Sequence, residues 1–174
     1  YWTKDQNIDD IATAGILTLS KSTESFAYEE SFASIDRRDD GATTAAWDGS
    51  GIIALPQNSG LYETPAAAQT IKINSANGWV ANATVEATET LNGGTIRYSL
   101  STDGGINFEQ VNLDELHAFV LRGSDLRLRI ELETPDTIST PSVDEVRVAY
   151  VLEQYQTPGT LESSTFDAGS QSVF

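Results

Sequence analysis

The sequence predicts an all-β protein, an antiparallel β-sandwich of jelly-roll type with an extended N-terminal strand segment. Two observations lead to this prediction. From about residue 69 onward, apolar and polar residues alternate with a period of two, which is typical of half-buried strands. The alternating runs are separated by turns rich in glycine and proline, and short strands at such spacing are typical of sandwiches.

Four runs show the alternation clearly: residues 79–88, 95–101, 125–134 and 143–152. In the third run, leucines and isoleucine face one side while arginines and glutamates face the other, as expected for a strand with one wet face. The same alternation places these side chains in the core: Trp79, Ala81, Ala83, Val85, Ala87, Tyr98, Val146, Val148, Tyr150 and Leu152.

The first 65 residues are less regular, with strands expected near 15–20, 26–32 and 51–55. No long amphipathic helix is predicted, and residues 112–118 are expected to form one helical turn. The predicted organisation is an N-terminal extension over 1–14, a sandwich over 15–155 and a C-terminal tail over 156–174. Phe166 and Phe174 in that tail are apolar enough to predict a further strand.

The charge balance excludes two classes of partner. The chain has 26 acidic and 10 basic residues, a net charge of −16, so nucleic acids and anionic membrane surfaces would repel it. No apolar run approaches the ~20 residues of a membrane span, so no membrane insertion is expected. The absence of cysteine fits a secreted protein without disulfides and fits a cytosolic protein as well.

The inventory of catalytic groups is small, and we predict that the protein is not an enzyme. His117 is the only histidine, and no G-x-S-x-G motif accompanies it. The 26 acidic residues create so many carboxylate pairs that no single pair indicates a glycosidase. No cofactor is expected.

Two loop regions carry recognisable turn chemistry. The segment 101–108, STDGGINF, resembles the Asp-box hairpin of sialidase propellers, which folds a turn and catalyses nothing by itself. The segment 36–51 concentrates carboxylates among turn residues without matching a D-x-D-x-D-G calcium loop. A Ca²⁺ ion bound there would take its ligands from Asp36, Asp39, Asp40 and Asp48; the alternative is a solvated acidic loop.

Two aromatic residues in loop-like surroundings are candidates for stacking against a polysaccharide, Trp47 and Tyr62. Trp79 and Tyr98 are set aside because the alternation assigns them to the core.

Two stretches resemble known families. Residues 26–152, with the DGG hairpin and the DLRLRIEL strand, resemble sandwich modules of large bacterial surface proteins. Residues 1–25, with the opening Tyr1-Trp2 pair and the segment AGILTL, resemble the mature N-terminus of the TasA and camelysin family of biofilm-matrix fibre proteins. That resemblance implies a secreted protein of the cell surface or extracellular matrix, whose N-terminal segment adds a strand to a neighbouring copy.

Two functions follow as expectations. The first is a structural subunit of an extracellular fibre or pilus-like filament, which polymerises head-to-tail with copies of itself through Tyr1, Trp2, Ile8 and Ile11. The second is a carbohydrate-binding or adhesive module of a larger secreted surface protein, with polysaccharide as its partner.

Overall fold

The computed structural model describes residues 8–10, 18–19 and 21–155. These residues form strands and contain no helix. The compact unit runs from Thr23 to Glu153, and the short pair β1 and β2 is described separately from it. The strands are β1 (Ile8–Asp10), β2 (Thr18–Leu19), β3 (Lys21–Glu30), β4 (Ile53–Ala54), β5 (Gln57–Asn58), β6 (Leu61–Tyr62), β7 (Ala66–Gln69), β8 (Trp79–Thr90), β9 (Thr95–Ser101), β10 (Glu109–Val111), β11 (His117–Ala118), β12 (Arg127–Glu133) and β13 (Ser142–Tyr155).

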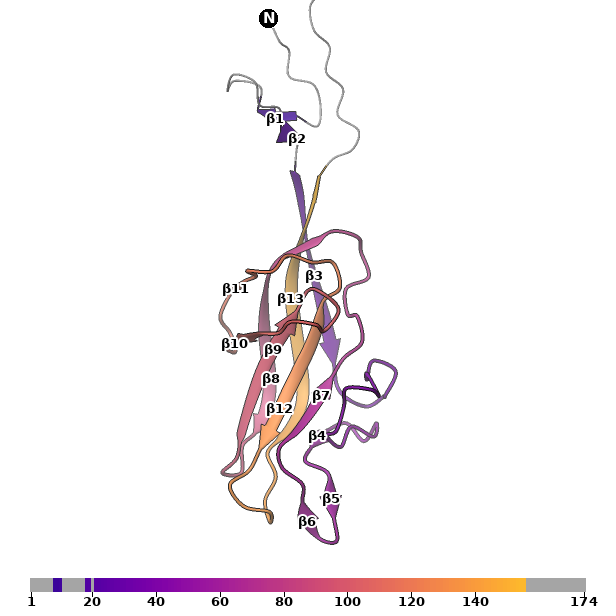
Figure 1. Ribbon diagram of the computed structural model, residues 1–174, viewed down its shortest axis with the longest axis vertical. Helices are drawn as coiled ribbons and strands as arrows, with labels where there is room; N and C mark the ends of the chain where they lie inside the picture. The colour runs from indigo at the N-terminus through magenta and orange to yellow at the C-terminus, as the bar shows by residue number, and fades with distance from the viewer. Residues whose placement is uncertain (1–7, 11–17, 20, 156–174) are drawn as a thin grey trace, which may run out of the picture. The chain divides into compact units, whose positions relative to one another are not determined.

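Two antiparallel sheets form the body, which confirms the predicted β-sandwich (Figure 1). One sheet has the order β10-β9-β12-β7. The other has the order β11-β8-β13-β3, and β4 pairs with the beginning of β13. A small hairpin, β5-β6, and the separate pair β1-β2 complete the strands.

The core lies between the sheets and follows the predicted alternation in three of the four runs. Leu126, Leu128, Ile130 and Leu132 are at most 2% exposed, while the arginines and glutamates between them face outward. Val146, Val148, Tyr150 and Leu152 of β13 are buried in the same way. Burying this apolar surface supplies most of the free energy that holds two sheets together.

The remaining run, residues 79–88, differs from the prediction at the start of β8. Val151 of β13 pairs with Asn82, but the next residue, Leu152, pairs with Val80, so Ala81 is the extra residue of a β-bulge. An extra residue reverses the phase of the alternation. Val80 is therefore fully buried, while Trp79 is 52% exposed, and the prediction that Trp79 points into the core is wrong.

The predicted helical turn over 112–118 is also wrong. Asp114 has a φ of 61°, which lies outside the helical region, and its N–H donates to Val85 O. Directly after it, His117 and Ala118 pair with β8 as strand β11. Pairing with the neighbouring sheet thus overrides the local helical pattern.

Candidate functional site

The edges of a β-sheet are where a sandwich is open to another strand. The described part of the sandwich has four edge strands, β7, β10, β11 and β3. Three of them are short or covered. β7 is covered by residues 36–46, because Thr44 and Ala45 donate their N–H groups to Ala67 O and Asp39 donates to Gln69 O.

The edges β10 and β11 are held by one carboxylate. Glu109 accepts hydrogen bonds from the N–H groups of Val120 and Leu121, at 3.1 and 3.0 Å, and lies 2.9 Å from His117 Nε2. Burial opposes the charge on Glu109, but these two N–H groups and His117 together lower the pKa of its carboxyl. Because Glu109 belongs to one sheet and His117 to the other, this contact joins the two sheets on that side.

The edge strand β3 is the longest edge of the described sandwich. It has ten residues, and within the described part of the chain no strand pairs with its outer side. Its register on β13 is antiparallel: Lys21 lies over the Tyr155 ring, Phe26 stacks on Tyr150, and Glu29 pairs with Arg147. The first five residues, 21–25, are all exposed.

The inner face of β3 nevertheless anchors it to the sandwich. The Phe26 and Tyr150 rings are 5.6 Å apart, and Tyr28 packs against the core. The Tyr28 hydroxyl donates to Glu30 at 2.8 Å. Burial and this neighbouring carboxylate raise the pKa of Tyr28 far above its ordinary value, so it stays a neutral donor.

Of the predicted interface residues, the structure describes one. Ile8 lies in β1 and pairs with Leu19 of β2, and the next registered pair, Asp10 with Thr18, follows after an irregularity. Tyr1, Trp2 and Ile11, like the tail 156–174, lie outside the described residues.

The two candidate glycan-stacking residues have different surroundings. Trp47 is 1% exposed: its ring meets Phe32 edge-on at 5.3 Å, and its Nε1 donates to Ser34 O. This corrects the assignment of Trp47 as a glycan contact, because a core side chain has no face to offer to a sugar. Tyr62 in β6 is half-buried against the core, and its role as a glycan contact stays a prediction.

The acidic loop uses most of its carboxylates internally. Asp39 pairs with Arg127 at 3.0 Å, Asp40 pairs with Arg38 at 2.6 Å, and Asp48 accepts the N–H of Ser50. Asp36 is exposed. Among the described residues no three histidine or acidic side chains are grouped to hold a metal ion, so the geometry gives the calcium prediction no support.

The Asp-box-like hairpin is a structural turn in this protein. Asp103 accepts hydrogen bonds from the N–H of Asn107, the Asn107 amide and the Ser101 hydroxyl, which lowers the pKa of its carboxyl to about 2. Gly104 and Gly105 have φ values of 80° and 87°, which a side chain would oppose. Phe108 packs on the outer face of the sheet, where the Arg129 guanidinium lies 5.5 Å from its ring centre.

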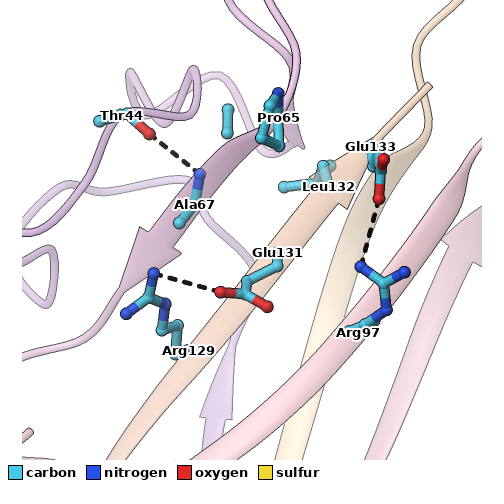
Figure 2. Close-up of a pocket in the computed structure, with 9 residues that line it drawn as sticks. Thr44, Pro65, Ala67, Arg97, Arg129, Glu131, Leu132 and Glu133 are labelled. Atoms are coloured by element: carbon cyan, nitrogen blue, oxygen red, sulfur yellow. Dashed lines mark hydrogen bonds and ion pairs between the residues drawn. The ribbon is translucent and has the colours of Figure 1, made fainter. Parts of the chain in front are cut away.

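A groove lies on the outer face of the four-stranded sheet. It could not be predicted from the sequence, because it combines three strands that are distant in the chain. It has a volume of about 320 Å³ and is lined by residues of β7, β9 and β12 and by Thr44 and Pro65 (Figure 2). Two ion pairs line the groove, Arg129–Glu131 at 3.1 Å and Arg97–Glu133 at 3.2 Å. Their side chains are 37–51% exposed, so solvent reaches all four charges.

No family model matches the sequence, and comparisons with curated proteins and with solved structures give no significant match. In the part of the chain that the structure describes, no helix has the length and apolarity that a membrane crossing requires.

Proposed function

We propose that the chain is a structural subunit of an extracellular filament, in which the N-terminal segment of one copy pairs as an added strand with β3 of the next. The observation that supports this proposal is the ten-residue edge of β3, which no described strand covers. An uncovered edge of this length is a template for another strand. In this proposal the protein is secreted, binds copies of itself, and acts as a structural protein without catalysis or cofactor.

The exchange of partners by the donor segment is energetically reasonable. Within its own chain, β1 makes two registered pairs with β2, and an isolated two-stranded ladder of this length is marginal in water. Pairing along β3 would offer a longer ladder. If pockets of the neighbour bury Tyr1, Trp2 and Ile8, each large side chain contributes about 1.5–3 kcal/mol, which offsets the entropy lost on ordering the segment.

The geometry of such a contact determines the form of the assembly. The donor segment and the acceptor edge are different surfaces, so the contact is heterologous and propagates as an open filament. The net charge of −16 makes subunits repel one another. Salt screens this repulsion, so we expect a higher ionic strength to promote assembly.

A charged residue on the edge tests the proposal. Ala27 is an exposed residue of β3, and Ala27→Lys should block strand addition, because lysine on an edge strand discourages pairing. The control is Thr88→Lys, which adds the same charge to exposed Thr88 on the interior strand β8 of the same sheet. Assembly is followed by light scattering and negative-stain electron microscopy, and folding by thermal denaturation.

The expected result is filaments from the wild type and from Thr88→Lys, with folded monomers from Ala27→Lys. Filaments from Ala27→Lys with unchanged mass per length, or a wild type that stays monomeric at all salt concentrations, would refute the proposal.

A second candidate, a carbohydrate-binding or adhesive module, is favoured by a different observation. The open groove of Figure 2 presents both hydrogen-bond donors and acceptors on a rigid sheet. Polysaccharide binding by variants of the groove residues tests this candidate.

A further inference from the structure

The groove continues beyond the Arg97–Glu133 pair. A second hollow of about 330 Å³ adjoins the first and shares these two residues with it. It is lined further by Gly93, Thr95, Thr134 and Pro135. Each hollow lies at the lower end of the range for small-molecule sites, about 300–1,000 Å³. Together they form an elongated site that suits a chain-like ligand better than a compact one.

The charges of this groove are balanced. Arg97 and Arg129 supply two positive charges, and Glu131 and Glu133 supply two negative ones. They form one ion pair between β9 and β12 and one within β12. An anionic or cationic ligand would meet as much repulsion as attraction. A hydroxyl group, in contrast, both donates and accepts, so a polyhydroxyl ligand can use guanidinium donors and carboxylate acceptors side by side.

Hydrogen-bonding capacity is left over in the same place. Within the described residues, two buried side-chain polar atoms lack a hydrogen-bond partner, Arg129 Nε and Thr134 Oγ1. Both residues line the groove, one in each hollow. Buried polar groups in folded proteins are nearly always paired, because an unpaired one costs free energy. Thr134 is only 5% exposed, and its hydroxyl can turn toward a ligand among the staggered χ1 positions.

The groove is also preorganised. Its charged residues stand on β9 and β12, which pair over seven residues without an irregularity. The Phe108 ring supports the Arg129 guanidinium from the side of the Asp-box-like hairpin. Pro65 and Pro135 supply apolar walls against which the C–H faces of a sugar ring can lie.

We propose that this groove binds a neutral saccharide chain, whose hydroxyls pair with the two Arg–Glu pairs and with the hydroxyl of Thr134. The site is separate from the β3 edge, so it does not depend on filament assembly. It gives the second candidate function a defined location on the four-stranded sheet. The exposed Trp79 belongs to β8, in the other sheet.

Affinity electrophoresis of the full-length chain tests the inference. Native gels are cast with a β-glucan, a mannan, a xylan or dextran, and with polygalacturonate as a charged comparison. Two variants probe the groove, Glu133→Gln and Thr134→Val. The matched control is Glu86→Gln, because Glu86 forms the equivalent exposed pair with Arg147 on the outer face of the other sheet, at 3.2 Å.

At least one neutral polysaccharide should retard the wild type and Glu86→Gln equally. Glu133→Gln and Thr134→Val should bind it roughly fivefold or more weakly, as expected for one lost hydrogen bond. Thr134→Val is the sharper variant, because the threonine hydroxyl has no hydrogen-bond partner among the described residues. A purely structural role of Thr134 therefore predicts unchanged or increased thermal stability and no loss of binding.

The inference is overturned if no neutral polysaccharide in the panel retards the wild type, if polygalacturonate retards it more than all of them, or if the groove variants bind like Glu86→Gln. Light scattering of the same variants reports filament assembly separately. Loss of saccharide binding in a variant that still assembles therefore concerns this site alone.

Discussion

Two edges of the same sandwich are treated differently by the chain. Beside the four-residue strand β7, residues 36–46 fold back and bond to its backbone. Beside the ten-residue strand β3, no described segment does so. Exposed edges invite pairing with other chains, and proteins ordinarily cover or shorten them. Within the described residues, therefore, the short edge is covered and the long edge has no strand beside it.

The segment that covers β7 is itself connected to the core. Trp47, from the segment after the β7 cover, is buried against Phe32, and Arg38 of the cover donates to Trp47 O. Glu24 and Glu29 of β3 are exposed charged residues. Such charges disfavour unspecific pairing but still permit pairing with a complementary strand.

The largest expected change in the free energy of unfolding comes from Trp47, next to the segment that covers β7. Trp47→Ala should lower the free energy of unfolding by about 3–5 kcal/mol, because it leaves a cavity beneath the cover of β7. Trp79→Ala should change it by about 0.5 kcal/mol or less, since Trp79 is 52% exposed. Urea denaturation followed by circular dichroism measures both. Equal losses in the two variants would contradict the assigned burial.

A smaller effect concerns the contacts of Glu109 at β10 and β11, which are called the clasp below. Glu109→Gln should cost about 1–2 kcal/mol near neutral pH, because it weakens charge-assisted bonds to Val120, Leu121 and His117. The pKa of Glu109 lies below its ordinary value of 4.5 in the folded state, so its contribution is present above that pH and is lost as the pH falls through the folded pKa. Denaturation at several pH values should show the difference between variant and wild type shrinking below about pH 4.5. A pH-independent difference would count against the clasp.

The smallest expected change in stability distinguishes two carboxylates in residues 36–46, the segment that covers β7. Asp39→Asn should cost about 1 kcal/mol, because Asp39 joins the cover to Arg127 of β12 and to the Gln69 amide. Asp40→Asn should cost less than about 0.5 kcal/mol, since its side chain is 76% exposed. Thermal denaturation of the two variants compares them directly, and a larger loss from Asp40→Asn would reverse the assignment.

The sequence predicted the strands whose alternation is regular. β9 runs over the predicted residues 95–101, and β12 and β13 overlap their predicted runs closely. In these strands the residues at the predicted inward positions are aliphatic or aromatic, so local pattern and tertiary packing agree. The fold class could be predicted for the same reason.

The two tryptophans show where local pattern fails. Trp47 stands beside Asp48-Gly49, which resembles a surface loop, but a distant partner, Phe32, draws it into the core. Trp79 fits an alternating run, but the bulge at Ala81 turns it outward. The adjacent apolar residues Trp79 and Val80 interrupt strict alternation and were the one available signal of that bulge.

The sites depend on topology in a similar way. The open edge of β3 exists because β3 is last in its sheet, and the groove exists because β7, β9 and β12 lie together. Neither strand order nor groove lining can be read from a single sequence without the fold.

The central claim is that the N-terminal segment of one copy pairs with β3 of another, and cysteine cross-linking tests it most directly. The chain has no cysteine, so introduced thiols have no competitors. Thr3→Cys protein is mixed under oxidising conditions with Thr23→Cys, Ser25→Cys or Ala27→Cys protein, and with Thr88→Cys as the control. The account predicts mixed disulfide dimers with at least one β3 variant and not with the control. Mixed dimers that form equally with Thr88→Cys, or a Thr3→Cys, Ser25→Cys double variant that closes only within its own molecule, would contradict it.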